Sequence, residues 1–381
     1  MAGFCGALLS LGCADHVPEL GGIDSGCIAQ LTGASGDVLL AQRTDSTLWV
    51  AQSGGQFSRV DGPDGPLSAD ESAASGSSAQ GTARGCAVVS GSAWCFPLTD
   101  PLLASSQSQV LTGPSADAPP LTGVTQFAGG TDDGGATFCA VTSDGKIWCW
   151  SDDPNGLLIH GENSSAAQPV LLDPNTEFSA AVEVRVGFDS ACARRSDGSV
   201  WCWGNDQYGQ LGTPAASAAA RSVYPVQVAL PGAASRLAAS PGNTQCAILD
   251  DTRVVCWGRN EFAEAGASSE TLVIPPTIVQ TQRGGPAFSG VVDLAPDRGM
   301  RAMCANTKNA GLWCWGDVLS EATAAVGSPY PIQLATSPQG RISVSLSAYG
   351  ASSGKLIYVN ANGRLVLGAG NMPSSRQPPC P

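Results

Sequence analysis

The stretch that decides the fold is CARRSDGSVWCWGNDQYGQLG, at residues 192–212. Its Ser196-Asp197-Gly198 segment has the composition of a three-residue hairpin loop, in which a type I turn precedes a glycine at positive φ. A hairpin centred on this loop places Cys192 opposite Cys202. Directly opposed cysteines of an antiparallel pair lie within disulfide reach. The stretch therefore predicts a β-hairpin closed by a Cys192–Cys202 bridge.

The same arrangement recurs in four other places. In one of them, a two-residue Ser90-Gly91 turn compensates for cysteines that are one residue closer, which indicates that the two sulfurs meet. Buried free thiols and a zinc site are the alternatives, but zinc sites usually have short Cys-x-x-Cys knuckles, and the chain has none. The further predicted pairs are Cys86–Cys95, Cys139–Cys149 around Ser143-Asp144-Gly145, Cys246–Cys256 and Cys304–Cys314, the last two with loops that lack glycine.

The cysteine position repeats with a period typical of propeller blades. Equivalent positions fall near residues 27, 86, 139, 192, 246, 304 and 357, the last without a cysteine. A period near 50 residues with strand-like content indicates a β-propeller. Upstream of each hairpin we expect a proline-led strand, such as Pro225-Val226, and a second strand, such as residues 182–186. The prediction is an all-β, seven-bladed β-propeller of four-stranded blades that forms a single domain over residues 13–381.

WCWGNDQYGQLG, preceded by a CAxxxDG hairpin, resembles the regulator-of-chromosome-condensation repeat in the cysteine-paired form found in bacterial proteins. The copy at Cys192 follows the pattern throughout. The copy at Cys246 has Ala265 where the pattern has leucine, the copy at Cys139 has Ser151 in place of a glycine, and the first and last copies match mainly by position. The resemblance covers most of the chain and implies a seven-bladed propeller.

Eight of the nine tryptophans flank the paired cysteines, as Trp201 and Trp203 flank Cys202. Neighbouring residues of a strand point to opposite faces, so ring and sulfur project in opposite directions. We expect each blade to present aromatic rings on one face and a disulfide on the other. An aromatic row that binds a ligand is the alternative interpretation.

Composition narrows the class of partner and compartment. A net charge of −13 and an isoelectric point near 4.5 argue against a nucleic-acid partner, which requires a basic face. The N-terminal apolar run ends in Leu-Gly-Cys and resembles the end of a bacterial lipoprotein signal peptide, although it is short and lacks a basic segment. We expect residues 1–12 to be a truncated signal segment, Cys13 to carry the lipid anchor, and the protein to be exported to the cell envelope or beyond. An ordinary apolar first strand is the alternative.

Four cysteines stand outside the five hairpins. If Cys5 is removed with the signal and Cys13 carries lipid, Cys27 and Cys380 remain for a sixth bridge between the first and last blades. If no signal is cleaved, Cys5 and Cys13 form the rival pair. Export also agrees with dense cysteine pairing, which belongs to oxidising compartments.

The sequence offers little catalytic chemistry. Its two histidines, His16 and His160, have no partners at ligand spacing, and Asp132-Asp133 and Asp152-Asp153 lack the alternating pattern of a calcium loop. No nucleophile elbow or phosphate-binding loop is present. We expect no catalytic residues, no metal and no cofactor. Recognition would fall to exposed loops, the longest of which are predicted at residues 61–82 and 259–290.

The favoured function is a non-catalytic, exported and lipid-anchored scaffold that binds a protein partner through rim loops, with no contact to nucleic acid and with membrane contact only through the anchor. Guanine-nucleotide exchange on a small GTPase, implied by the family resemblance, is an alternative. A sugar-binding propeller is another, with Tyr208 and Phe262 as the aromatic candidates. A propeller enzyme is the least supported class, since it needs convergent histidines, carboxylates or a metal.

Overall fold

The structure is a computed structural model of the 381-residue chain. It describes residues between 28 and 369, with gaps of four or more residues at 34–37, 52–57, 76–82, 99–107, 152–163, 214–220, 297–300, 319–326, 337–343, 346–354 and 360–364 and shorter gaps elsewhere. Residues 1–27 and 370–381 lie outside the described part.

The described residues form seven main antiparallel sheets, here numbered as blades 1–7. Blades 1–6 have four strands each and blade 7 has three. The strands of blades 1–3 are β1 (Ile28–Gly33), β2 (Leu39–Arg43), β3 (Leu48–Ala51) and β4 (Ser58–Arg59); β7 (Ser72–Ser75), β8 (Arg84–Val89), β9 (Ser92–Pro97) and β10 (Ser108–Gln109); and β11 (Val124–Thr131), β12 (Ala136–Thr142), β13 (Ile147–Ser151) and β14 (Ser164–Pro169).

Blades 4–7 continue in the same order along the chain. Their strands are β17 (Ala181–Val186), β18 (Ser190–Arg195), β19 (Val200–Asn205) and β20 (Arg221–Gln227); β21 (Ala234–Ala239), β22 (Thr244–Leu249), β23 (Val254–Arg259) and β24 (Val273–Ile278); β25 (Val291–Pro296), β26 (Ala302–Thr307), β27 (Gly311–Gly316) and β28 (Ser328–Thr336); and β29 (Val344–Ser345), β30 (Lys355–Val359) and β31 (Leu365–Ala369). Two short hairpins, β5 (Asp61–Gly62) with β6 (Gly65–Pro66) and β15 (Leu171–Asp173) with β16 (Thr176–Glu177), connect blades.

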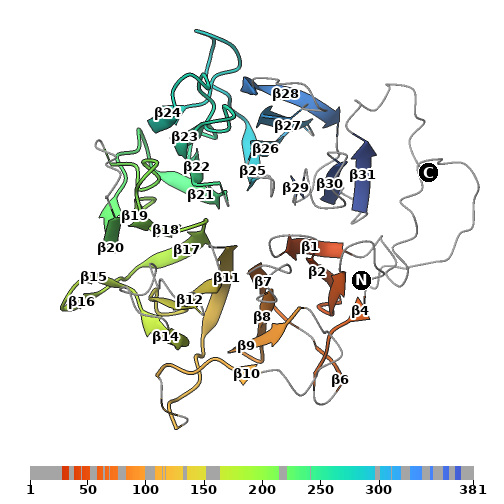
Figure 1. Cartoon of the computed structure of the whole chain (residues 1–381), viewed down its shortest axis with the longest axis vertical. Coiled ribbons are helices and arrows are strands. Elements are labelled where there is room, and N and C mark those ends of the chain that lie inside the picture. Colours follow the sequence, from red (N-terminus) through yellow and green to blue (C-terminus); the bar gives the residue numbers. More distant parts are fainter. Residues whose placement is uncertain are drawn as a thin grey trace, which may run out of the picture.

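The blades lie around a common centre, which their first strands surround (Figure 1). The first strands of consecutive blades are in contact from β1 through β7, β11, β17, β21 and β25 to β29, and β1 also contacts β30 of blade 7. The predicted all-β, seven-bladed propeller is thus confirmed, with the fourth strand of blade 7 not among the described strands.

The five hairpins have the predicted register. Cys192 pairs with Cys202, and the four other predicted pairs are likewise directly opposed. All five pairs of sulfur atoms lie at disulfide distance, with S–S separations of 1.98–2.11 Å and Cα–Cα distances of 4.0–4.1 Å.

The turns explain this register. In the shorter hairpin both Ser90 (φ 52°) and Gly91 (φ 76°) adopt the left-handed region that a two-residue type I′ turn needs. Where the three-residue loop lacks glycine in blade 5, Thr252 takes the positive φ of 71° instead. Asp197 acts as a turn former: its Oδ1 accepts hydrogen bonds from the hydroxyl (2.6 Å) and the N–H (2.8 Å) of Ser199, which lower its pKa.

The predicted grouping of strands into blades is wrong in one respect. We expected the proline-led strand to join the hairpin that follows it, but Pro225-Val226 lies in β20 and pairs with β19 of the preceding hairpin, with Val226 opposite Cys202. The proline strand is the fourth, outermost strand of its blade. Proline fits there because an edge strand needs no N–H on its outer side.

Two further expectations need correction. The first repeat was expected near Cys27, but the register of β2 and β3 places Leu40 opposite Val50 at the cysteine positions of blade 1. The predicted exposed loop at 61–82 contains the β5–β6 hairpin and β7, whose four residues are buried. The small Ser and Ala residues of β7 resemble loop composition, yet they suit the crowded first strand of a blade.

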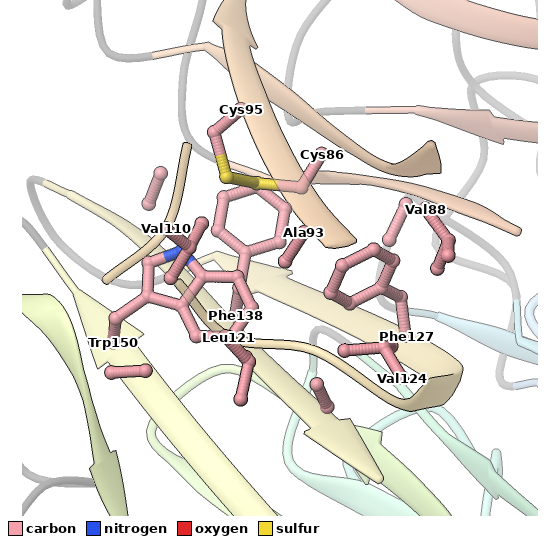
Figure 2. Packing of buried hydrophobic residues seen from close by; sticks show 14 residues of the cluster. Cys86, Val88, Ala93, Cys95, Val110, Leu121, Val124, Phe127, Phe138 and Trp150 are labelled. Atoms are coloured by element: carbon pink, nitrogen blue, oxygen red, sulfur yellow. A yellow bond between two sulfur atoms is a disulfide. The ribbon is translucent and has the colours of Figure 1, made fainter. Parts of the chain in front are cut away.

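Disulfides and tryptophans alternate between blades as predicted. The Cys86–Cys95 bridge of blade 2 packs in one cluster with Trp150 of blade 3, where Trp150 also stacks on Phe138 at a centroid distance of 5.8 Å (Figure 2). The later blades repeat this arrangement, with Trp203 against the bridge of blade 3, Trp257 against that of blade 4 and Trp315 against that of blade 5. The tryptophans that directly follow the cysteines are therefore core residues, as expected, and do not form the alternative ligand-binding row.

Candidate functional site

The site is built on the loops that follow the third strands of blades 4 and 5. In blade 4, Asp206 is buried, and its Oδ1 accepts the N–H of Leu211 at 2.9 Å while its Oδ2 accepts the hydroxyl of Thr213 at 2.8 Å. Gly209 and Gly212 have positive φ values of 71° and 67° and complete the turn. The loop is thus fixed by its own motif residues.

Blade 5 uses an asparagine at the same place to fix a longer loop. Oδ1 of Asn260, which is fully buried, accepts the N–H of Ala265 at 3.0 Å. Its Nδ2 donates to the carbonyls of Ser268 (2.9 Å) and Thr271 (3.0 Å). An amide supplies donors that a carboxylate lacks, so Asn260 can hold carbonyl groups from the far end of the loop. Exposed Leu272 follows directly.

Tryptophans of the next blade anchor both loops. The Nε1 of Trp257 donates to the carbonyl of Gln210 at 3.0 Å, and the Nε1 of Trp315 donates to the carbonyl of Glu264 at 2.9 Å. Both indoles are fully buried. Each loop is therefore a joint between two blades as well as an exposed surface.

The two aromatic candidates for sugar binding lie at these joints. The guanidinium of Arg259 lies 5.2 Å from the ring centre of Tyr208, and that of Arg301 lies 4.7 Å from the ring centre of Phe262. Arg259 also pairs with Glu261, and Arg301 pairs with Asp317 at 3.4 Å. One face of each ring is covered by an arginine of the next blade, so that face is not open for stacking a sugar.

We call the surface made by residues 206–213, 260–272 and Arg301 the long-loop rim. It combines an exposed apolar side chain, Leu272 at 58% exposure, with a cation whose side chain is 54% exposed, Arg301. Arginine and aromatic side chains are enriched where proteins bind each other. The rim thus presents an apolar side chain and a cation to solvent.

A second set of polar side chains surrounds the centre. Gln126, Glu183, Arg236 and Asp293 occupy one register position in the first strands of blades 3–6. Gln126 Oε1 accepts the N–H of Val184 at 2.8 Å, Glu183 Oε2 accepts that of Leu237 at 3.1 Å, and Arg236 pairs with Asp293. These groups connect adjacent blades through these contacts.

The remaining sequence candidates fall in segments that the structure does not describe. Cys5, Cys13, Cys27, Cys380, His16, His160, Asp132, Asp133, Asp152 and Asp153 lie outside the described residues. Within the described part, no three His, Cys, Asp or Glu side chains gather as a metal site would require. The same part has no helix of the length and apolarity needed to cross a membrane.

Taken together, the cysteine-paired blades and their interlocking third-strand loops define a repeat propeller. Residues 181–210 and 197–249 match the regulator of chromosome condensation (RCC1) repeat. The chain is an RCC1-like repeat protein. The sequence motif in blade 4 was the signal for this family, and it also marks the start of the long-loop rim.

Relatives share part of this chain. Human E3 ubiquitin-protein ligase HERC2 is 28% identical over 193 residues, 48% of this chain but 4% of HERC2. The mitochondrial RCC1 domain-containing protein RUG3 of Arabidopsis thaliana is 28% identical over 134 residues, 35% of this chain and 29% of RUG3. The chain thus spans a small share of the curated relatives it matches.

Solved structures share the fold over a larger part. Prp20p of Saccharomyces cerevisiae, described with its binding to Gsp1p and histones, aligns with a TM-score of 0.59 at 13% identity, covering 80% of this chain and 76% of Prp20p. Human WBSCR16 aligns with a TM-score of 0.57 at 17% identity, covering 83% and 85% of the two chains.

Proposed function

We propose that this protein is a non-catalytic scaffold that binds a protein partner through the long-loop rim. The observation that carries the proposal is that buried Asn260 and Trp315 fix a loop on which Leu272 is exposed and half-buried Phe262 lies against Arg301. Such fixing lowers the entropy lost on binding. Prp20p, with the same fold, has described protein partners, which supports this class of function.

Replacing Arg301 is expected to weaken partner binding. Arg301→Ala removes the exposed cation of the rim and uncovers Phe262, so recovery of the partner should fall roughly tenfold or more, as for an interface hot spot. The measurement is quantitative cross-linking and capture from the envelope fraction, followed by titration with the purified partner.

Arg253→Ala is the matched control. Arg253 also pairs with an aspartate, Asp251, but lies in the β22–β23 hairpin at the opposite end of the strands. Equal loss of binding in both variants, or none in Arg301→Ala, would contradict a role for the long-loop rim.

We also propose that the protein is exported and anchored through a lipid on Cys13. Five cysteine pairs at disulfide distance suit an oxidising compartment. Peptide mapping of the native, unreduced protein is expected to find a mature chain that starts at a lipid-modified Cys13 and a Cys27–Cys380 bridge. A Cys5–Cys13 bridge, or an unmodified peptide across Cys13, would reject the lipid anchor, and free thiols at Cys27 and Cys380 would reject the bridge.

Nucleotide exchange on a small GTPase is the second candidate function. Its support is the RCC1 repeat match together with the likeness to Prp20p in fold. An oxidised, exported chain would not meet a cytosolic GTPase, so the compartment found by the mapping experiment also discriminates between the two candidates.

A further inference from the structure

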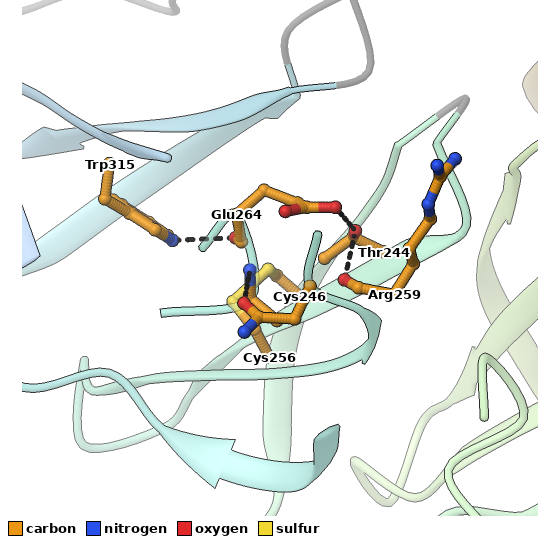
Figure 3. Close-up of a disulfide and its surroundings, with 8 residues drawn as sticks. Thr244, Cys246, Cys256, Arg259, Glu264 and Trp315 are labelled. Atoms are coloured by element: carbon orange, nitrogen blue, oxygen red, sulfur yellow. Dashed lines mark hydrogen bonds between the residues drawn. A yellow bond between two sulfur atoms is a disulfide. The ribbon is translucent and has the colours of Figure 1, made fainter. Parts of the chain in front are cut away.

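A carboxylic acid is buried at the joint between blades 5 and 6. Glu264 lies in the loop after β23 and is 1% exposed. Its backbone carbonyl accepts the indole N–H of Trp315 from blade 6, while its side chain turns back toward β22 of its own blade (Figure 3). The residue therefore links the long-loop rim to the next blade.

The carboxyl group of Glu264 is hydrogen-bonded only to uncharged groups among the described residues. Oε2 accepts the N–H of Phe262 at 2.7 Å. Oε1 lies 3.4 Å from Oγ1 of Thr244, whose hydroxyl donates to the carbonyl of Arg259 at 2.8 Å. A hydroxyl has one hydrogen and a carbonyl can only accept, so the shorter contact uses it. The hydroxyl of Thr244 therefore gives the carboxyl group of Glu264 at most a weak, shared hydrogen bond, and a proton on Oε1 of Glu264 would strengthen this contact.

The charged groups around this carboxyl are engaged elsewhere. Arg259, at the end of β23, pairs with Glu261, and Arg301 of blade 6 pairs with Asp317. The side that β22 presents is the uncharged Thr244, and β27 presents the indole of Trp315. Glu264 has no ion pair with a described residue.

Glu183 is a second buried carboxyl group, and unlike Glu264 it has charged partners. It lies 3.0 Å from the guanidinium groups of both Arg185 and Arg194 and accepts a backbone N–H as well. Without such partners a buried carboxyl favours its neutral form. In agreement, burial raises the pKa of Glu264 to about 7, against the lowering effect of backbone hydrogen bonds and of Arg259.

Blade 4 has an amide at the same place. Gln210 is fully buried, its Oε1 accepts the N–H of Tyr208 at 2.8 Å, and its carbonyl accepts the indole N–H of Trp257. These backbone contacts match those of Glu264, although Nε2 of Gln210 has no partner in the described part of the chain where Oε1 of Glu264 contacts Thr244, and an amide keeps its hydrogens at every pH. Blade 5 therefore has a titratable side chain, Glu264, at the position where blade 4 has the non-titratable Gln210.

We propose that Glu264 is a proton-dependent lock of the long-loop rim: when protonated it holds residues 260–272 against blade 6, and when it loses the proton the loop and the Phe262–Arg301 pair loosen. The lock itself is independent of the proposed function. Its consequence for a partner rests on that function, because the same loop forms the binding surface.

The sign of the pH dependence follows from the raised pKa. The folded protein holds this proton up to about pH 7, whereas the unfolded chain releases it near the ordinary value of 4.5. The stabilisation is complete below pH 4.5 and is lost as the pH rises through 7. Other groups add their own dependence, so the contribution of Glu264 is read as a difference between variants.

The experiment compares the wild type with Glu264→Gln and Gln210→Glu between pH 5 and 8. Infrared spectra of the wild type at pH 5.5 should contain a protonated-carboxyl band that disappears as the pH rises through 7 and is missing in Glu264→Gln. Hydrogen exchange of the Trp315 indole, corrected for intrinsic rate, should speed up at least tenfold in the wild type and stay level in Glu264→Gln. Gln210→Glu should confer the same behaviour on Trp257.

The outcomes separate the lock from the proposed function. An absent protonated-carboxyl band in the wild type would overturn the lock, and this measurement does not depend on the folding of any variant. Equal pH dependence of Trp315 indole exchange in the wild type and in Glu264→Gln would also overturn it. If the lock holds but partner capture is equal at pH 5.5 and 8, the proposed use of this rim fails instead. Loss of capture at pH 8 that Glu264→Gln prevents would support both.

Discussion

Reduction of the five cysteine pairs is expected to unfold this protein at temperatures where the oxidised form is folded. The bridges are buried, with exposures of 0–9%, so a reductant reaches them only when a blade opens. Opening exposes the sulfurs, and the reduced chain then lacks the constraint that favoured refolding. Reduction should therefore proceed slowly in the native state and rapidly near the unfolding midpoint.

The size of the effect follows from loop length. In the chain-entropy treatment a ten-residue loop contributes at most about 2.7 kcal/mol, so five contribute at most about 13 kcal/mol. Domains have net stabilities of roughly 5–15 kcal/mol. The thermal midpoint in excess reductant should fall by about 15 °C or more. Calorimetry with and without reductant, with free thiols counted by mass spectrometry, measures this.

A single pair provides the control. The double variant Cys192→Ala, Cys202→Ala removes one bridge and should lose about 2–3 kcal/mol, a fraction of the full effect. An unchanged melting curve in a sample whose thiols are fully reduced would show that the bridges do not stabilise the fold.

Trp315→Ala is expected to destabilise the protein by about 3–5 kcal/mol, the range for a large buried aromatic. The ring is fully buried in a cluster with Cys246 and Cys256 of blade 5, and it packs edge-on against Phe288 at 6.0 Å. The change also leaves the carbonyl of Glu264 without its indole donor. Denaturant titration followed by circular dichroism gives the free energy of unfolding.

Two controls divide this effect into its parts. Trp315→Phe keeps an aromatic ring but removes the indole N–H, so it should cost about 1–3 kcal/mol for the unsatisfied carbonyl. Trp313→Ala changes the tryptophan two residues earlier, which is half-buried. A loss in Trp313→Ala as large as that in Trp315→Ala would contradict the assignment of Trp315 as the residue that joins the blades.

The hairpins were predictable because their determinants are local. Loop length and turn residues set the register within about ten residues, as the compensating shortening at Ser90-Gly91 demonstrates. The alternation of ring and sulfur follows from the two-residue period of a strand. Both features are confirmed in each blade that carries the cysteines.

The predictions that were wrong concern features that a local sequence pattern does not determine. The proline-led strand has the same sequence whether it joins the hairpin before or after it, and only the sheet pairing of Val226 with Cys202 decides. In blade 1, Leu40 and Val50 replace the cysteines, so no sulfur marked the repeat. In β7, small residues form a buried strand where composition alone indicated a loop.

By itself the sequence determined the all-β class, the seven repeats and the five cysteine pairs, because turns and strand periodicity act over short distances. The tertiary structure decided which side chains meet across a joint between blades, since Trp315 and Glu264 are about 50 residues apart and belong to different sheets. Only this packing puts the guanidinium of Arg301 over Phe262 and the indole of Trp315 against the loop that contains Glu264. The charge state of the Glu264 carboxyl, and with it the proposed control of the rim, depends on burial by a neighbouring blade.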